Sequence, residues 1–174
     1  MSEQTRKQVN YTVSCIHEFA RRKKISQRDA YLFLQQYQGI SFLNEFYDVE
    51  HTLSMNDAID DLETVCRKNG GELQTTDESV FISYGACDTV LTESRCGEVS
   101  KAELLIEYIT QDIVSRLMEE ENLSMEEALN QFYTSQTFSK LIDQETGLYL
   151  DASASVYALY QDEQETGELV QNEI

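Results

Sequence analysis

The residues with the clearest capacity for chemistry lie in one short stretch, SFLNEFYDVEHTL at 41–53. It contains His51, one of two histidines in the chain, with Tyr47 and Asp48 before it and Thr52 directly after it. On a helix that began near Ser41 and continued through the stretch, Asp48 would lie one turn from His51 and could orient its ring. That arrangement is half of a general acid–base constellation.

The alternative for this stretch is a structural corner, in which His51 closes a helix end and hydrogen-bonds locally. No serine elbow or glycine-rich turn accompanies the Asp48 and His51 pair. We therefore expect the structural role and keep a small enzyme centred on Asp48 and His51 as an alternative. The apolar residues of the stretch are then expected to supply core: Phe42, Leu43, Phe46 and Tyr47.

The other candidates for metal or redox chemistry are His17 and four cysteines. Cys15 and His17 are two residues apart, and side chains two apart on a helix diverge, so they cannot share a metal there. No two cysteines form a CxxC pair, and Cys87 and Cys96 are expected to be ordinary thiols. The chain contains no phosphate-cradling glycine loop and no HExxH, GxSxG or EF-hand pattern. We expect no metal, no cofactor and no enzymatic activity.

Charge is distributed very unevenly along the chain. Residues 1–71 hold nine Lys and Arg against ten Asp and Glu, whereas residues 72–174 hold four against twenty-two. Such a surface repels nucleic acid phosphates, whose binding depends on Lys and Arg, so we expect no direct nucleic-acid binding. It suits a basic protein partner, whose approach it would speed. Two alternatives are that the acids only keep a small domain soluble, or that they mimic nucleic acid phosphates.

Composition also bears on compartment and fold class. No apolar run approaches the roughly 20 residues that span a bilayer, and MSEQTRKQVN has no apolar core of a secretory signal. We expect a cytoplasmic protein with reduced cysteines and no membrane association. Proline is absent and glycine is scarce, which favours a mainly helical chain.

Helix signals support that class. Serines at 26, 54 and 124 are each followed three residues later by an acid, which is the pattern of a helix N-terminus. Before the first of them, apolar residues spaced three and four apart predict an amphipathic helix. Its expected core face consists of Val9, Val13, Ile16, Phe19 and Ala20. The RRKK sequence at 21–24 then reads as a solvated helix end rather than a nucleic-acid patch.

The two halves of the chain resemble each other at an offset of 98 residues. At this offset Ser26 aligns with Ser124, and apolar residues align at helical core positions. We therefore predict two similar small helical bundles stacked as a pseudo-dimer. The expected divisions are an N-terminal helical domain at 1–71, a connecting segment at 72–98 and an acidic helical domain at 99–174. The connecting segment is rich in β-branched residues and predicts short strands or extended chain.

Two parts of the acidic half are candidate partner-binding surfaces. The first is a group of acids on either side of a predicted helix turn: Glu119, Glu120, Glu121, Glu126 and Glu127. The second is the loop Thr146, Gly147, Leu148, Tyr149 and Leu150. Three large side chains in a row cannot all face one core, so at least one is exposed or covered by another surface. Alternatively, Leu148 and Leu150 pack inward and Tyr149 covers the rim.

These motifs also carry a family resemblance. Residues 9–66, with the Y-D-x-x-H-T corner at Tyr47, Asp48, His51 and Thr52, resemble small uncharacterised bacterial helical proteins that carry a domain of unknown function. Residues 101–169, with D-x-x-T-G-L-Y-L, are similar to a second group of small helical proteins. Members of such families resemble partner genes of ADP-ribosyltransferase-like toxins. The resemblance implies an antitoxin-like or immunity role, and it does not imply an enzyme.

Overall fold

The computed structural model describes residues 1–73 and 99–166, and every regular element within those ranges is helical. The helices are α1 Glu3–Lys23, α2 Gln27–Gln36, α3 Gly39–Glu45, α4 Tyr47–Glu50, α5 Met55–Lys68, α6 Lys101–Glu120, α7 Met125–Thr134, α8 Gln136–Ile142 and α9 Ser153–Thr166. Two short 3-10 turns, η1 Gln144–Thr146 and η2 Leu148–Leu150, precede α9. The prediction of a mainly helical chain is confirmed. The strands expected at 72–98 fall almost wholly outside the described residues.

Serine side chains cap the starts of several helices. The side chains of Ser26, Ser54 and Ser124 each accept a hydrogen bond from the backbone N–H three residues later, as the sequence predicts. Ser100 does the same for α6 and forms a reciprocal capping box with Glu103. Each such cap satisfies an N–H that has no partner inside the helix and typically stabilises the helix by about 1 kcal/mol.

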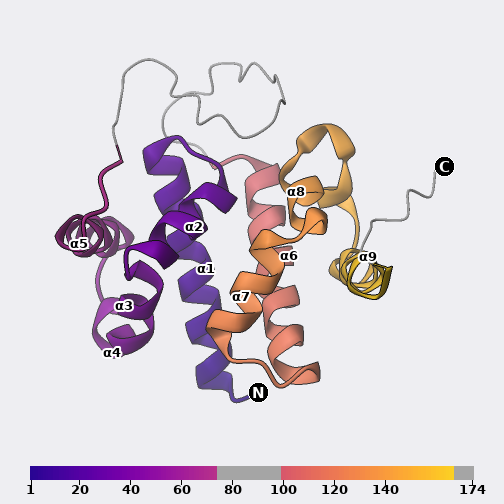
Figure 1. Ribbon diagram of the computed structural model, residues 1–174, viewed down its shortest axis with the longest axis horizontal. Helices are drawn as coiled ribbons and strands as arrows, with labels where there is room; N and C mark the ends of the chain where they lie inside the picture. The colour runs from indigo at the N-terminus through magenta and orange to yellow at the C-terminus, as the bar shows by residue number, and fades with distance from the viewer. Residues whose placement is uncertain (74–98, 167–174) are drawn as a thin grey trace.

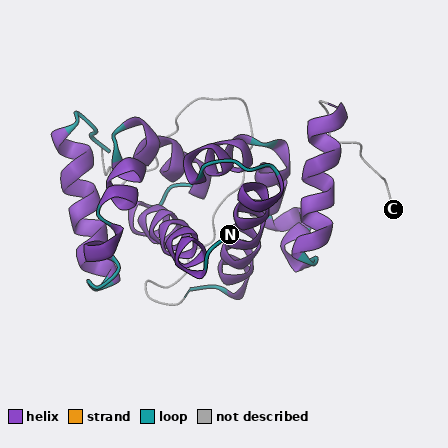
Figure 2. Cartoon of the chain, turned by 90° about the horizontal axis from the view of Figure 1, so that it is seen from below, coloured by secondary structure: helices purple, strands orange, loops and turns teal. Residues whose placement is uncertain are grey.

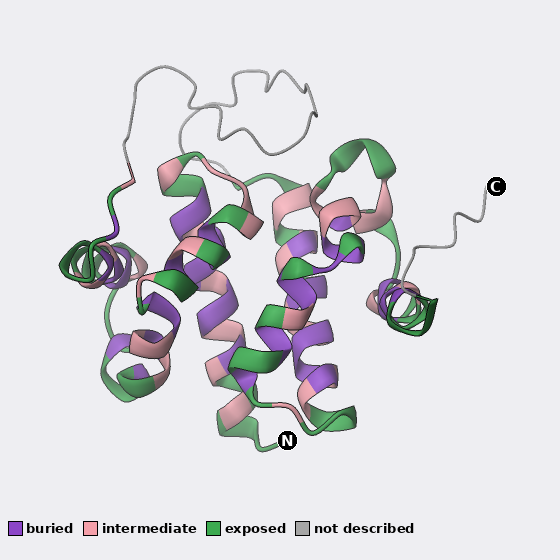
Figure 3. Ribbon diagram, viewed as in Figure 1, coloured by how far each residue is buried: buried purple, intermediate pink, exposed green. Residues whose placement is uncertain are grey.

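The helices are arranged around a central pair. Helices α1 and α6 lie side by side, α2 packs on α1, α7 packs on α6, and α5 and α9 lie at opposite ends of the molecule (Figures 1 and 2). Buried residues line the inward faces of the central pair (Figure 3). The predicted core face of α1 is correct, since all five of its residues are at most 2 % exposed.

Both halves contribute to one hydrophobic core. The clearest contact is between Tyr31 on α2 and Tyr133 on α7, whose buried rings stack with centroids 4.6 Å apart. Offset stacking of aromatic rings adds about 0.5–1.5 kcal/mol beyond the area that the rings bury. The halves are therefore packed against each other through their side chains.

The chain changes direction at residues 45–54, where α3 ends and the single turn of α4 follows. The interruption falls at Phe46, which has φ −104° and ψ 15° instead of helical angles. Leu43 and Tyr47 are buried as predicted, and Phe42 is partly buried against the core. The prediction that Phe46 supplies core is wrong, because the break turns it outward and leaves it 45 % exposed.

Candidate functional site

The corner at 47–52 is held by local hydrogen bonds. The Nδ1 atom of His51 lies 2.5 Å from the backbone oxygen of Tyr47, and the two rings stack at 4.6 Å. The Thr52 hydroxyl donates to the backbone oxygen of Val49 at 2.7 Å. The helix break places Asp48 on an exposed turn, and its carboxylate makes no hydrogen bond within the described residues. The geometry supports the structural role for His51, since its ring is used to close the end of α4.

Two titratable side chains at or near this corner, Glu50 and Cys15, are buried, which the sequence did not predict. Glu50 is 5 % exposed, and its Oε2 has no hydrogen-bond partner among the described residues. Burial, and then the nearby charge of Asp61, raises the pKa of the Glu50 carboxyl. Burial also raises the pKa of the Cys15 thiol to about 12. A thiol this weakly acidic is protonated at neutral pH and is no nucleophile.

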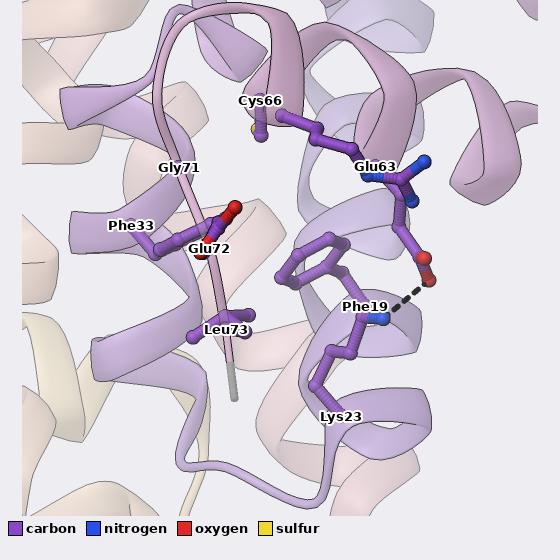
Figure 4. Close-up of a pocket in the computed structure, with 9 residues that line it drawn as sticks. Phe19, Lys23, Phe33, Glu63, Cys66, Gly71, Glu72 and Leu73 are labelled. Carbon is purple, nitrogen blue, oxygen red and sulfur yellow. Dashed lines mark ion pairs between the residues drawn. The ribbon is translucent and has the colours of Figure 1, made fainter. Parts of the chain in front are cut away.

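A cavity of about 420 Å³ opens between α1, α2 and α5 (Figure 4). Phe19 and Phe33 form its apolar side, and the ion pair of Lys23 with Glu63, 2.8 Å long, lies at its edge. Burial raises the pKa of Cys66 in its wall to about 11. The Cys66 thiol in the cavity is therefore protonated at neutral pH, and the charges of Lys23 and Glu63 offset each other. The cavity is bounded by Gly71–Leu73, where the first described range ends.

The predicted acidic surface is brought together at one end of the molecule. The turn from α6 to α7 carries four exposed glutamates that we call the acidic end: Glu119, Glu120, Glu121 and Glu126. This turn lies at the lower edge of Figure 1, beside the N-terminus. Glu127, the fifth candidate, is occupied in the capping box of α7, where hydrogen bonds with Ser124 lower the pKa of its carboxyl.

The four carboxylates differ in how they are held. Glu119 lies 3.2 Å from the Met1 amino group, and Glu120 accepts a hydrogen bond from the Tyr157 hydroxyl at 2.9 Å. Glu126 accepts from the Asn44 amide at 3.4 Å, across the contact between the halves. The Glu121 side chain makes no hydrogen bond or ion pair with any other described residue. It is the carboxylate most available to a partner.

The second candidate surface, at 146–150, is a tight loop. Thr146 donates to the backbone oxygen of Lys140 at 2.7 Å, and Gly147 adopts φ +68°, which glycine tolerates without strain. Leu148 and Tyr149 pack partly against the core. Leu150 does not pack inward: it is 67 % exposed. The loop therefore presents one large apolar side chain to solvent.

One structural carboxylate could not have been found from local sequence. Glu163 on α9 is 8 % exposed and accepts hydrogen bonds from the backbone N–H groups of Gln136 and Thr137, at 2.7 and 2.9 Å. It also accepts from the Thr137 hydroxyl at 2.7 Å. Glu163 therefore joins α9 to the N-terminus of α8 across 26 residues of sequence, a distance at which no capping pattern operates.

No group of three or more His, Cys, Asp or Glu suited to a metal ion occurs among the residues at 1–73 and 99–166. Within the same residues, no helix is long and apolar enough to cross a membrane. Among the described residues, the His51 ring contacts the backbone oxygen of Tyr47, and burial keeps the thiols of Cys15 and Cys66 protonated by raising their pKa.

Comparison with known proteins places part of the chain in a family context. Residues 10–69, which run from within α1 to just after α5, match a family model described as a protein of unknown function, DUF3791. The expectation of an uncharacterised domain family is confirmed for this part of the chain. No curated protein and no solved structure matches the chain.

Proposed function

We propose that this protein is a non-enzymatic binding module that neutralises a basic protein partner through its acidic end. The observation that carries the proposal is the position of three consecutive acids, Glu119–Glu121, in the last turn and C-cap of α6. Partial negative charge at a helix C-terminus favours cations there and disfavours acids. Glu121 has no hydrogen-bond or ion-pair partner among the described residues that would offset this conflict, and departures from a local rule are expected at functional sites.

The first half of the molecule provides the contrast. The last turn of α1 contains Arg21, Arg22 and Lys23, which complement the helix dipole. Of these, Arg22 and Lys23 are paired with acids of α5, including Glu63. The last turn of α6 contains no basic residue. At the end of α1, acids of α5 pair with the basic residues. At the end of α6, a partner that supplies cations would pair with the acids in the same way.

We further infer that the two halves are copies of one helical unit. The bounds of α7 and α9 lie 98 residues after those of α2 and α5, the offset seen in the sequence. Lys24 and Asn122, also 98 apart, both follow a long helix and both have φ 54°. In this alignment Arg21–Lys23 correspond to Glu119–Glu121, so one structural position carries opposite charge in the two copies.

Contacts between the halves support the same inference. Arg28 donates to the Ser139 hydroxyl at 2.7 Å, and Ser41 donates to Glu126 at 3.5 Å. At the offset of 98, Arg28 corresponds to Glu126 and Ser41 corresponds to Ser139. Each of the two pairs is therefore the counterpart of the other, as expected for two copies related by a two-fold axis. The acidic end then belongs to a copy whose charge has diverged from that of its neighbour.

The partner class is taken from the sequence resemblance. An ADP-ribosyltransferase-like toxin with a basic nucleotide-binding cleft would match an acidic antitoxin or immunity protein in charge. The compartment we propose is the cytoplasm, and the unpaired thiols of Cys15 and Cys66 are compatible with it.

The test is capture of the partner by a tagged chain from its native host, at low salt, with identification by mass spectrometry. Two double variants are compared: Glu119→Lys with Glu121→Lys at the acidic end, and Glu45→Lys with Asp48→Lys on exposed positions of the first half as a control matched in charge. We expect a stoichiometric basic protein with the wild type and the control, and its loss with the acidic-end variant.

Thermal unfolding of each variant separates loss of binding from loss of folding. Recovery of the wild-type chain without any partner would contradict the proposal. Release of the captured partner by added DNA or RNA would favour the nucleic-acid mimic over the toxin neutraliser.

A further inference from the structure

A second concave surface lies between α1 and α6, beside the start of α5. This α1–α6 groove has a volume of about 270 Å³, just below the roughly 300 Å³ at which small-molecule pockets begin. Its apolar lining comes from both halves: Ala20, Ile25, Met55, Val99 and Leu104. A groove of this size and lining suits anchoring side chains of a protein partner.

Apolar exposure continues from the groove along α6. Leu104 is 54 % exposed and Tyr108, one turn later on the same face, is 63 % exposed. The residues 98 positions earlier, on α1, are Arg6 and Asn10. Exposed apolar side chains on α6 therefore replace polar ones on α1, and a contiguous exposed apolar face marks an interaction surface.

Fixed carboxylates surround the groove. Glu103 is held by the backbone N–H of Ser100 at 2.7 Å, and Glu107 accepts from Gln111 at 3.1 Å. Glu18 also lines the groove and is paired with Arg21, the one cationic side chain in the lining. Two of the three carboxylates are therefore positioned without a neutralising cation.

The groove also contains an unsatisfied ring nitrogen. His17 lines it, is 8 % exposed, and its Nε2 has no hydrogen-bond partner among the described residues. Burial lowers the pKa of His17 to about 4, so the ring is neutral at neutral pH. A neutral ring protonated on Nδ1 presents Nε2 as an acceptor, which suits a donor such as a Lys or Arg side chain.

We propose that the α1–α6 groove binds a cationic amphipathic segment of the partner protein, with apolar side chains seated between Met55 and Leu104 and Lys or Arg side chains on Glu103 and Glu107. This rests on the proposed function, since it names a second contact for the same basic partner. Helices with one apolar face commonly dock in grooves of this kind.

The chain itself offers no occupant of matching charge. Residues 74–98 hold five acids and one arginine, and residues 167–174 hold two acids and no Lys or Arg. A second copy carries a net charge of −19 and is repelled. Charge complementarity therefore selects a foreign, basic segment.

The four methionines of the chain make a direct test practicable. Met55 lines the groove, whereas Met1 and Met125 lie near the acidic end, so ¹³C-methyl NMR of methionine distinguishes the two surfaces. The probe is an amphipathic Lys/Leu peptide of roughly 15 residues, about four helical turns. A Glu/Leu peptide with the same pattern is the control for charge.

We expect the Lys/Leu peptide to shift the Met55 signal and the Glu/Leu peptide to leave it unchanged. Leu104→Gln should weaken binding about tenfold, as loss of an interface anchor does. Leu32→Gln, at a site 40 % exposed on α2, is the matched control and should bind normally. Shifts at Met1 and Met125 without Met55, or equal affinity of the Leu104→Gln variant, would overturn the proposal.

The same variants separate this inference from the proposed function. If Leu104→Gln still captures the native partner while the acidic-end variant does not, the groove proposal fails and the neutraliser proposal stands. If the peptide seats at Met55 and Leu104 but no basic partner is captured from the host, the groove is still a site for cationic amphipathic segments and the neutraliser proposal fails.

Discussion

The rings of Tyr31 and Tyr133 stack 4.6 Å apart, and neither buried hydroxyl has a hydrogen-bond partner among the described residues. The two residues are 102 positions apart in the chain and join α2 to α7. Burial raises the pKa of both phenols. This contact holds the two halves together through ring packing, with no contribution from the oxygens.

This stack predicts different outcomes for two substitutions at Tyr31. Tyr31→Phe removes an unsatisfied hydroxyl and keeps the ring, so stability should stay unchanged or rise by about 1 kcal/mol. Tyr31→Ala removes the ring and should cost about 3–5 kcal/mol. Urea unfolding followed by circular dichroism measures both. A large loss for Tyr31→Phe would mean that the hydroxyl has a partner.

Glu163 should be a stabilising residue despite the excess of acids around it. Glu163→Ala leaves the N–H groups of Gln136 and Thr137 without their acceptor and should destabilise the protein by about 1.5–3 kcal/mol, the usual range for charged hydrogen bonds. Glu165→Ala, two residues later and exposed, is the control. Equal unfolding free energies for the two variants would exclude the capping role.

Two neighbouring glutamates should respond in opposite directions to the same change. Glu121→Gln removes a charge that opposes the dipole of α6 and should stabilise the fold by about 0.3–1 kcal/mol. Glu127→Gln weakens the capping box of α7 and should destabilise it. Thermal melts at low and high salt measure both. A lower melting temperature for Glu121→Gln would contradict the prediction that the charge of Glu121 destabilises α6 through the helix dipole.

Glu127 also makes stability depend on acid pH. Hydrogen bonds with Ser124 lower the pKa of its carboxyl in the folded state, so its contribution is present above the unfolded-state pKa. That contribution is lost as the pH falls through the folded-state pKa. In the Glu127→Gln variant, this part of the acid destabilisation should be missing.

His17 adds a pH dependence at higher pH. Its pKa falls from 6.5 to about 4 on folding because it is buried. The unfolded chain therefore binds more protons between these values, and stability is full above pH 6.5 and decreases as the pH falls toward 4. The loss is about 3 kcal/mol on the scale of 1.36 kcal/mol per pKa unit.

Unfolding free energies measured across that pH window test this prediction. The slope should disappear in a His17→Leu variant and persist in a His51→Asn variant, since His51 is exposed. A wild-type slope that is unchanged by His17→Leu would assign the effect to groups other than His17, and Glu50 is not one of them because its slope has the opposite sign. Since burial raises the pKa of Glu50, that group favours the folded state when protonated.

Local sequence was sufficient for the helices and their caps. Serine followed by an acid at Ser26, Ser54 and Ser124 predicted three helix starts, because capping depends on atoms within three residues of each other. The apolar spacing of 9–20 predicted the buried face of α1 for a similar reason, since helical period and side-chain type are both local properties.

The candidate site was only partly foreseeable. The glutamates at 119–121 were recognised by their charge. Recognising that they oppose the dipole of α6 required knowing where that helix ends. The sequence pointed to His51, whereas the ring with an unsatisfied nitrogen in a groove is that of His17. Whether a histidine is buried depends on which helix covers it, and no local pattern in the sequence specifies that helix.

The sequence by itself determined that the chain is helical, where its main helices begin, and that its second half is strongly acidic. Only the tertiary structure decided that Tyr31 meets Tyr133, that Glu163 caps α8, that Phe46 and Leu150 face solvent, and that a groove opens between α1 and α6. The physical reason is range. Propensity and capping act within a few residues, while packing and burial depend on residues that come together only when the two halves fold against each other.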